Sequence, residues 1–241
     1  MSSWAVMASS PDDLGFDGSR FILPPLEIHR HRAIGEVKPM DGALFADDVS
    51  AINMHAVKRQ TAEARCDAAA ELIGAERDEP WVIWCDTDLE SSILAARVKD
   101  AIEVKGSLDA DKKEARIASF SEGRAPYIIT KAGITGMGLN WQHCARQVFV
   151  GRSFSYEAWY QAVRRCWRFG QTRPVHVHLI VAEGEDQIGR VIDRKAEAHA
   201  DMKDAMIAAS RRAVHARSAV KVKYTPTYEG RIPSWLTSDA A

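Results

Sequence analysis

Residues 81–85 read WVIWC, an unbroken run of large apolar side chains followed directly by the polar turn Asp86-Thr87-Asp88. A run this short and this uniformly apolar is typical of a strand that is buried on both faces of a parallel sheet. Similar runs follow at residues 101–104, 127–130 (YIIT), 147–150 (QVFV) and 175–181. Helix-like segments separate these runs. The alternation predicts an α/β fold, a parallel sheet of about five or more strands with helices on both faces.

The intervening segments have helical periodicity. They are expected at Leu89 to Lys99, at Asp109 to Phe120 and at Tyr156 to Phe169. Upstream, the alanine-rich stretch from Val49 to Ile73 predicts one long helix, with Gly74 as its C-cap.

The two ends of the chain differ from the middle. Prolines and glycines interrupt the first forty residues, and neither helical nor strand periodicity persists there. We therefore expect an irregular arm or inter-lobe linker at 1–48, an α/β domain at 49–183 and a helical extension with a basic tail at 184–241. The tail region holds the densest basic cluster, which a solvated helix face explains better than a phosphate site: Arg211, Arg212, Arg217, Lys221 and Lys223.

Composition restricts the class of protein. The net charge of −1 gives no global basic signature, so any contact with nucleic acid must come from a local patch. The cysteines are far apart and form no C-x-x-C pair, which argues against a cysteine-bound metal. No apolar run approaches the ~20 residues that span a bilayer. We expect a cytoplasmic protein with reduced thiols and no membrane partner.

Residues 160–171 read YQAVRRCWRFGQ and hold the most informative charges. Gln161, Arg165 and Arg168 stand at i, i+4 and i+7, so a continuous helix would place them on one face. Two arginines beside the carboxyl ends of parallel strands offer forked donors to phosphate oxygens. In phosphoryl transfer, such arginines neutralise the charge that develops on the γ-phosphate.

Residues 129–141 read ITKAGITGMGLNW, a glycine-rich loop that follows a predicted strand. Thr130 and Lys131 stand at the end of that strand, where open α/β sheets bind their ligands. Gly133, Gly136 and Gly138 keep the loop free of side chains, so that backbone N–H groups can approach an anion.

Together these two segments resemble motifs VI and V of superfamily 2 helicases, in the Swi/Snf-like branch of DNA translocases. Arg164 stands where that branch usually has glycine. WVIWCDTDLES resembles the motif IV strand and the helix start after it, with Thr87 or Asp88 as the cap. Gly106 and Lys113 resemble the family's strand–Gly-Ser–helix element. The opening residues resemble the linker between the two lobes of phage- or prophage-type members.

The resemblance implies the second RecA-like lobe of an ATP-dependent DNA helicase or translocase. It implies arginine fingers at Arg165 and Arg168, with Gln161 beside them, and ATP near Gly136, Gly138 and Asn140. It implies contacts to the DNA backbone at Thr130, Lys131, Gly106 and Lys113.

The sequence lacks the G-x-x-x-x-G-K-[ST] loop that cradles phosphates, and it lacks the acidic box that binds Mg²⁺. ATP and Mg²⁺ are therefore expected to be bound mainly by a first RecA-like lobe, upstream or in a separate chain. The alternative is a non-catalytic fragment that binds DNA or a helicase partner and regulates it. An unrelated nucleotide-dependent α/β enzyme would have a glycine-rich turn after its first strand, where this chain has Asp86-Thr87-Asp88.

Other candidates carry less weight. His176 and His178 share one strand face, but the sequence places no third ligand beside them, and His29 and His31 lie in the predicted arm. No metal site is therefore expected. The tryptophans that could stack on bases are expected mainly in the core: Trp141, Trp159 and Trp167.

Overall fold

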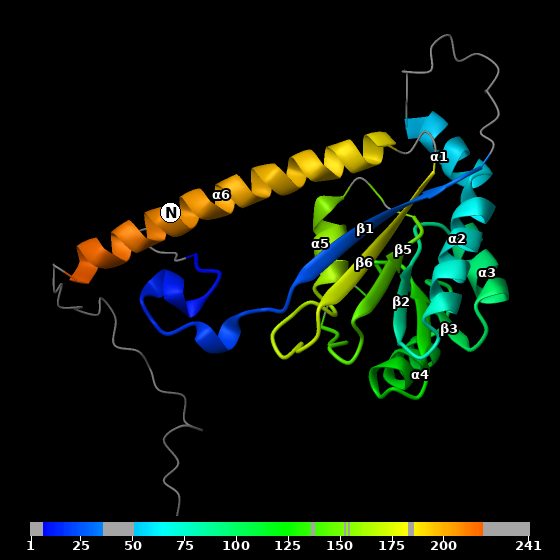
Figure 1. Ribbon diagram of the computed structural model, residues 1–241, viewed down its shortest axis with the longest axis horizontal. Helices are drawn as coiled ribbons and strands as arrows, with labels where there is room; N and C mark the ends of the chain where they lie inside the picture. Colours follow the sequence, from blue (N-terminus) through cyan, green and yellow to red (C-terminus); the bar gives the residue numbers. More distant parts are fainter. Residues whose placement is uncertain are drawn as a thin grey trace, which may run out of the picture. The chain divides into compact units, whose positions relative to one another are not determined.

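The computed structural model describes residues 7–35, 51–135, 138–151, 153, 155–182 and 186–218, with the backbone alone at 51–54, 186–188 and 214–218. Figure 1 shows the elements in chain order. They are η1 (Pro11–Leu14), η2 (Ser19–Phe21), β1 (Leu26–Ala33), α1 (Ala51–Gln60), α2 (Ala62–Ala75), β2 (Trp81–Trp84), α3 (Asp88–Arg97), β3 (Ala101–Val104), α4 (Ala110–Ser121), β4 (Tyr127–Thr130), β5 (Arg146–Phe149), α5 (Tyr156–Val163), β6 (Val175–Ala182) and α6 (Asp186–Ser218).

The sheet has the strand order β1-β6-β5-β2-β4-β3, and every neighbouring pair of strands is parallel. From β2 the chain runs out to β3 at one edge, returns to β4, and then crosses β2 to reach β5. Trp84 at the end of β2 is in register with Thr130 on one side and Phe149 on the other. The carboxyl ends of these three strands therefore meet at a topological switch point, where open α/β sheets bind ligands. We call this side of the sheet the carboxyl edge.

Helices cover both faces of the sheet, as the sequence predicts. On one face, Trp81 and Ile83 join a core with residues of α2 and α3. On the other face, Val82 and Trp84 join a second core with residues of α4 and α5. Successive strand residues point to opposite faces, so the burial of both faces explains why WVIWC is apolar throughout.

The expectation of an irregular arm up to residue 48 is wrong for Leu26–Ala33. These residues form β1, which pairs with β6 along its whole length, from Leu26↔Val175 to Ala33↔Ala182. β1 is an edge strand, and edge strands tolerate charged and polar side chains that a central strand does not. Exposed side chains such as Arg32 therefore hide this strand from a search for apolar runs.

The predicted long helix is two helices, α1 and α2, which meet at Thr61. The hydroxyl of Thr61 donates to the carbonyl oxygen of Val57 (2.9 Å) and accepts from Nε of Arg65 (3.2 Å). Bonding of a hydroxyl back to the preceding turn is a known cause of helix bends. The break lies next to a buried arginine, Arg65, in the first turn of α2.

A separate small unit comprises residues 7–17 and 202–218 of the described chain. Ser10 caps η1, and Arg211 pairs with Asp13 at 2.7 Å. Of the predicted basic cluster, Arg211 is thus held by a carboxylate and Arg212 is exposed. The side chain of Arg217 is not among those described, and Lys221 and Lys223 lie outside the described residues. No helix in the described ranges is long and apolar enough to cross a membrane.

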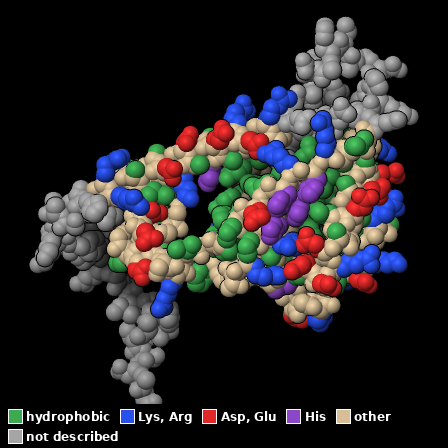
Figure 2. All heavy atoms as spheres, viewed as in Figure 1, with side chains coloured by type: hydrophobic (Ala, Val, Ile, Leu, Met, Phe, Trp, Pro, Cys, Tyr) green, Lys and Arg blue, Asp and Glu red, His purple; other side chains and the backbone are tan. Residues whose placement is uncertain are grey.

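Four histidines lie on one face of the β1–β6 pair, and Figure 2 shows histidine side chains gathered in a patch there. We call His29, His31, His176 and His178 the histidine cluster. Nε2 of His29 lies 3.1 Å from Nδ1 of His176, and Nε2 of His31 lies 2.9 Å from Nδ1 of His178. Of the four, His178 is the most deeply buried, at 7% exposed.

His178 predicts acid sensitivity of the fold. Burial, and then the neighbouring His29 and His31, lower the pKa of His178 to about 4. In the unfolded chain a histidine has a pKa near ~6.5, so the unfolded state binds more protons as the pH falls from about 6.5 to about 4. The free energy of unfolding should therefore fall by about 2–3 kcal/mol across this window. Urea denaturation in the presence of a chelator measures the free energy of unfolding at each pH. In His178→Gln, the decrease between about pH 6.5 and about pH 4 should be smaller by about 2–3 kcal/mol. Equal pH profiles for the two proteins would contradict the assignment.

Candidate functional site

A cavity of about 330 Å³ opens at the carboxyl edge. Residues that follow β2 and β4 line it together with residues that precede α5. The polar lining comes from Asp86, Lys131, Ser153 and Ser155, with Gly133 and Gly151 between them, and the aromatic lining from Trp84, Phe149 and Trp159. The cavity therefore contains charged and hydroxyl groups above an aromatic floor, and the glycine-rich loop predicted from the sequence forms part of its wall.

A fully buried ion pair lies behind this edge. Nη1 of Arg65, on α2, lies 2.6 Å from Oε1 of Glu90, on α3, and both side chains are completely inaccessible to solvent. The Arg65 guanidinium also donates to the carbonyl oxygens of Lys58 (2.6 Å) and Val150. One arginine thus joins α1, α2, α3 and the segment after β5.

Glu90 uses its second oxygen to shape the start of α3. Oε2 accepts from the backbone N–H groups of Asp86 (2.8 Å) and Thr87 (3.0 Å), and the Thr87 hydroxyl accepts from the Glu90 N–H. This capping box makes Thr87 the cap of α3 and leaves Asp88 outside that role. A Cβ on Gly151 would lie 2.5 Å from Oε2 of Glu90, so this position requires glycine.

Lys131 lies at the mouth of the cavity in a partly exposed ion pair. Its Nζ is 2.9 Å from Oδ1 of Asp88, and the Asp88 side chain is 77% exposed. The hydrogen bond and charge of Lys131 lower the pKa of the Asp88 carboxyl below its ordinary value. An ion pair this exposed adds little stability. Lys131 can therefore exchange Asp88 for a phosphate at small cost.

The Thr130 side chain does not point to this surface. It is fully buried, and its hydroxyl donates to the Val104 carbonyl oxygen at 3.4 Å. The expected contact between the Thr130 side chain and a DNA phosphate is therefore not available in this arrangement. The physical reason is that Thr130 is the last residue of the buried strand β4, whereas Lys131 follows the strand and is partly exposed.

Gly106 and Lys113 lie together beyond β3, on the same side of the sheet. Nζ of Lys113 donates to the Gly106 carbonyl oxygen at 2.7 Å, and the pair is exposed. Asp109 caps α4 through the Lys112 N–H. Lys113, on α4 after β3, and Lys131, after β4, thus both lie along the carboxyl edge.

The glycine-rich loop and the arginine segment also meet. Nη1 of Arg165 and Nη1 of Arg168 both donate to the Leu139 carbonyl oxygen, at 3.5 and 3.2 Å. Nη2 of Arg165 lies 3.4 Å from Oε1 of Gln161. Leu139 stands between Gly138, whose φ of 81° favours glycine, and Asn140. Gly136 lies outside the described residues.

The helix that carries these arginines is shorter than predicted. α5 ends at Val163, and the expectation of a helix through Phe169 is wrong beyond that point. The N–H of Trp141 donates to the Arg165 carbonyl oxygen at 2.9 Å, which takes the acceptor that a continuing helix needs. Arg165 and Arg168 therefore converge through a turn that the Leu139–Trp141 segment stabilises. The i, i+4, i+7 spacing of a continuous helix is therefore not what brings the two arginines together.

Arg164 replaces the family's usual glycine without strain. Its φ of −68° and ψ of −2° are ordinary helical values, which any residue adopts. The guanidinium carbon lies 5.3 Å from the ring centre of Trp167. Arg164 therefore faces an indole ring and has a different environment from Arg165 and Arg168.

The electrostatics of the two converging arginines favour an anion. Arg165 is 6% exposed, and burial followed by the nearby Arg168 cation lowers its pKa. In the part of the chain that the structure describes, no carboxylate lies within ion-pair distance of Arg168. Its Nε is buried without a hydrogen-bond partner there. Two neighbouring cations that share a carbonyl oxygen are strongly stabilised by a phosphate.

Gln171, the last residue of the motif, has a structural role. Nε2 of Gln171 donates to the carbonyl oxygens of Gln142 (2.9 Å) and Cys144 (3.1 Å). The preceding Gly170 has φ of 94°, and a Cβ there would lie 2.9 Å from Nε2 of Gln142. Both residues anchor the arginine segment to the loop that carries Leu139.

The tryptophans divide between core and cavity. Trp141 is fully buried, and Trp167 donates its Nε1 to the Pro24 carbonyl oxygen at 2.8 Å, which fits a structural role for both. Trp159 lines the cavity, and its Nε1 is buried without a hydrogen-bond partner among the described residues. Trp159 is the one of the three that is placed to contact a ligand.

A parallel sheet of this order, covered on both faces, has a RecA-like fold. Residues 64–170 match the family model described as helicase conserved C-terminal domain. This part of the chain is therefore similar to the conserved C-terminal domain of helicases. The transcriptional regulator ATRX homolog of Caenorhabditis elegans is 27% identical over 119 residues, which are 47% of this chain and 8% of that protein.

Solved structures show the same fold at low identity. The RNA helicase Prp28 from Chaetomium thermophilum bound to ADP has a TM-score of 0.51 and 12% identity, over 73% of this chain and 37% of that one. A variant of Dbp5 from S. cerevisiae bound to RNA and ADP BeF3 has a TM-score of 0.50 and 16% identity, over 61% of this chain and 43% of that one. The chain thus spans less than half the length of these proteins.

Sequence reasoning missed the residues behind the site, namely Lys58, Arg65, Glu90 and Gly151. Lys58 is nearly buried, and its Nζ is 2.6 Å from Oδ2 of Asp86 at the cavity. The spacing T-x-x-E from Thr87 to Glu90 is a capping-box signal that identifies Glu90. No comparable local signal marks Arg65, because all its partners except Thr61 and Lys58 lie far away in the sequence.

Removal of Arg65 should destabilise the lobe far more than removal of a surface arginine. Arg65→Met leaves Glu90 buried without its counter-ion, which costs about 3–5 kcal/mol of unfolding free energy. The double variant Arg65→Met/Glu90→Gln should recover part of this loss, because a neutral amide oxygen still accepts from the Asp86 and Thr87 N–H groups.

The matched control is Arg97→Met, which removes an ion pair with Asp67 whose side chains are both about half exposed. It should cost less than about 1 kcal/mol. Urea denaturation measures all three proteins. Equal losses for Arg65→Met and Arg97→Met would show that the buried pair has no special role.

Proposed function

We propose that this chain is the second lobe of an ATP-dependent DNA translocase and supplies the arginine side of a composite ATPase site. The observation that carries the proposal is the convergence of Arg165 and Arg168 on the Leu139 carbonyl oxygen. The Leu139 carbonyl oxygen carries no net charge, so a phosphate is a stronger partner for the Arg168 guanidinium, and Arg165 lies beside it. The family match at residues 64–170 supports the same reading.

The first lobe, upstream or in a separate chain, binds most of ATP and its Mg²⁺. When the lobes close, Arg168 and Arg165 leave the Leu139 carbonyl and donate to the γ-phosphate, where they neutralise the charge of the transition state. Gln161 holds the Arg165 guanidinium in position until then. Loss of the γ-phosphate removes the anion that keeps the lobes together, and the lobes reopen.

Lys131 and the Gly106–Lys113 pair form the nucleic-acid side of the proposal. Lys131 exchanges Asp88 for a backbone phosphate, and Lys113 adds a second cation along the same edge. We assign duplex DNA as the ligand because the motifs resemble the Swi/Snf-like branch and the ATRX homolog belongs to the proteins that this chain matches. The binding test below also distinguishes duplex DNA from RNA. The cytoplasmic location and the phage or prophage type stay predictions from the sequence.

Arg168→Ala should abolish ATP hydrolysis by the assembled lobes. The chain alone should hydrolyse no ATP, and activity should appear when a matching first lobe and duplex DNA are added. An arginine finger contributes about 10³–10⁵ in turnover, so Arg168→Ala should lower kcat by that order while DNA binding persists. Arg164→Ala is the matched control, since this neighbouring arginine faces Trp167.

Near-normal turnover by the Arg168→Ala assembly would refute the arginine-finger role. Absence of turnover in every mixture, with DNA binding retained, would instead favour a non-catalytic fragment that binds DNA or a helicase partner.

Lys131→Ala should weaken binding of this chain to DNA in a salt-dependent way. Loss of one phosphate contact lowers the slope of log affinity against log salt by about 0.9 for duplex DNA. Fluorescence anisotropy over a salt series measures the slope, with Arg97→Ala as a control that removes an exposed cation at the end of α3. An unchanged slope contradicts a phosphate contact at Lys131. Tighter binding of single-stranded RNA than of duplex DNA would contradict the assignment of DNA.

A further inference from the structure

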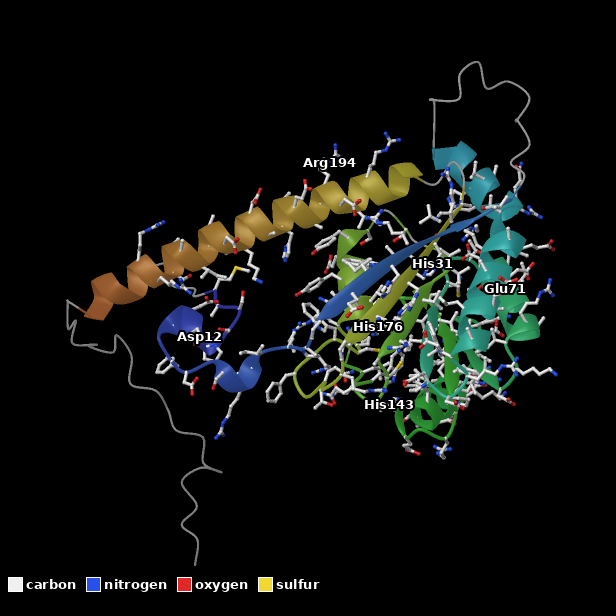
Figure 3. The ribbon with its side chains drawn as sticks, in the orientation of Figure 1. Asp12, His31, Glu71, His143, His176 and Arg194 are labelled. Carbon is white, nitrogen blue, oxygen red and sulfur yellow. The ribbon has the colours of Figure 1, made fainter. Side chains whose placement is uncertain are left out.

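The histidine cluster has a geometry that ordinary strand histidines do not need. β1 and β6 are parallel and in register, so side chains at alternate positions form two rows on one face. His29 stacks on His178 with ring centres 4.8 Å apart, and it also stacks on His176 at 5.4 Å. Figure 3 shows His31 and His176 on these adjacent strands. Glu27 extends the β1 row next to His176, with which it is in register.

Three atoms at the open end of this cluster are mutually close. Nε2 of His29 and Nδ1 of His176 are 3.1 Å apart. Oε2 of Glu27 lies 3.3 Å from Nδ1 of His176 and 3.7 Å from Nε2 of His29. A tetrahedral zinc site has bonds of ~2.0–2.1 Å, which places its ligand atoms roughly 3.3 Å apart. The three observed separations scatter around this value.

We propose that Glu27, His29 and His176 bind a divalent transition-metal ion of the zinc class. Imidazole nitrogens with one carboxylate oxygen form a typical donor set for Zn²⁺, Co²⁺, Ni²⁺ or Cu²⁺, whereas Mg²⁺ and Ca²⁺ prefer oxygen donors alone. The three side chains reach the surface, Glu27 being 46% exposed, so solvent can supply a fourth ligand.

Neighbouring residues hold these ligands in place. The buried His178 lies against the His29 ring, and Nε2 of His31 lies 2.9 Å from Nδ1 of His178. The nearest cation beside His176 is Arg146, whose Nε is 2.6 Å from Oε2 of Glu76. This ion pair limits the repulsion that Arg146 exerts on a bound cation. The sequence alone favours ordinary strand histidines because it does not predict β1. That strand supplies the other two ligands, Glu27 and His29.

A metal at this position joins two strands that are 147 residues apart in the sequence. β1 is the edge strand, paired on one side only. An ion held by Glu27 and His29 on β1 and by His176 on β6 clamps this edge to the rest of the sheet. The ion therefore stabilises the folded state, and the gain grows with the logarithm of its free concentration over its Kd.

The test is a titration of the full chain with Co²⁺ as the spectroscopic probe and Zn²⁺ as the competitor. We expect ligand-field bands in the visible range that saturate at one equivalent of Co²⁺. The sulfur charge-transfer bands of a cysteine site should be absent, and added Zn²⁺ should remove the ligand-field bands. Zn²⁺ should also raise the melting temperature. A spectrum of hexaaqua Co²⁺, or bands that arise from thiolate, would overturn the proposal.

Glu27→Gln and His176→Ala should each weaken Co²⁺ binding at least about tenfold, since loss of an outer-shell partner alone costs about 10–100-fold. Glu27 is exposed, so Glu27→Gln keeps the test valid if His176→Ala fails to fold. His143→Ala is the control, because His143 contacts Phe120 elsewhere in the molecule. Equal affinity of Glu27→Gln and the wild-type chain, or equal losses in His143→Ala, would also overturn the proposal.

Discussion

The buried ion pair between Arg65 and Glu90 is the constraint on which the carboxyl edge depends. Two charges without access to water are unfavourable unless nearly every donor and acceptor is satisfied. Here the Arg65 guanidinium reaches Glu90, the Thr61 hydroxyl and two carbonyl oxygens, and Glu90 accepts two further N–H groups. The pair therefore fixes the start of α3, the segment after β5 and the break between α1 and α2 at the same time. Its main effect is to specify one arrangement of these loops.

The ligand-facing residues follow a different electrostatic rule. Behind the edge, Arg65 and Lys58 are satisfied by carboxylates. Beyond the end of α5, Arg165 and Arg168 share a carbonyl oxygen, and at the carboxyl edge Lys131 has a carboxylate that is mostly exposed. Arg168 and Lys131 gain most from an incoming phosphate, because a neutral carbonyl oxygen and an exposed carboxylate are weak partners. The contrast separates residues that stabilise the lobe from residues that are available for ligands.

The sequence predicts the central strands and the motif loops well, because both depend on local patterns. WVIWC is apolar on both faces, and the glycines after β4 mark a loop wherever the rest of the chain lies. β1 is missed because its pairing with β6 is a long-range contact and its side chains are polar. The predicted length of α5 is wrong because the N–H of Trp141, which is distant in the sequence, ends the helix. The orientation of Thr130 and the partner of Arg65 likewise depend on tertiary contacts that no local pattern contains.

The most direct test of the account is the distance between the two lobes when a nucleotide analogue binds. All four cysteines are buried, so Lys112→Cys on the exposed start of α4 can carry a selective spin label, with a second label on the first lobe. With ADP BeF3 and DNA present, the distance should shorten in the otherwise unchanged assembly and should stay long in Arg168→Ala. Closure of the Arg168→Ala assembly to the same distance and at the same nucleotide concentration would contradict the role of the converging arginines.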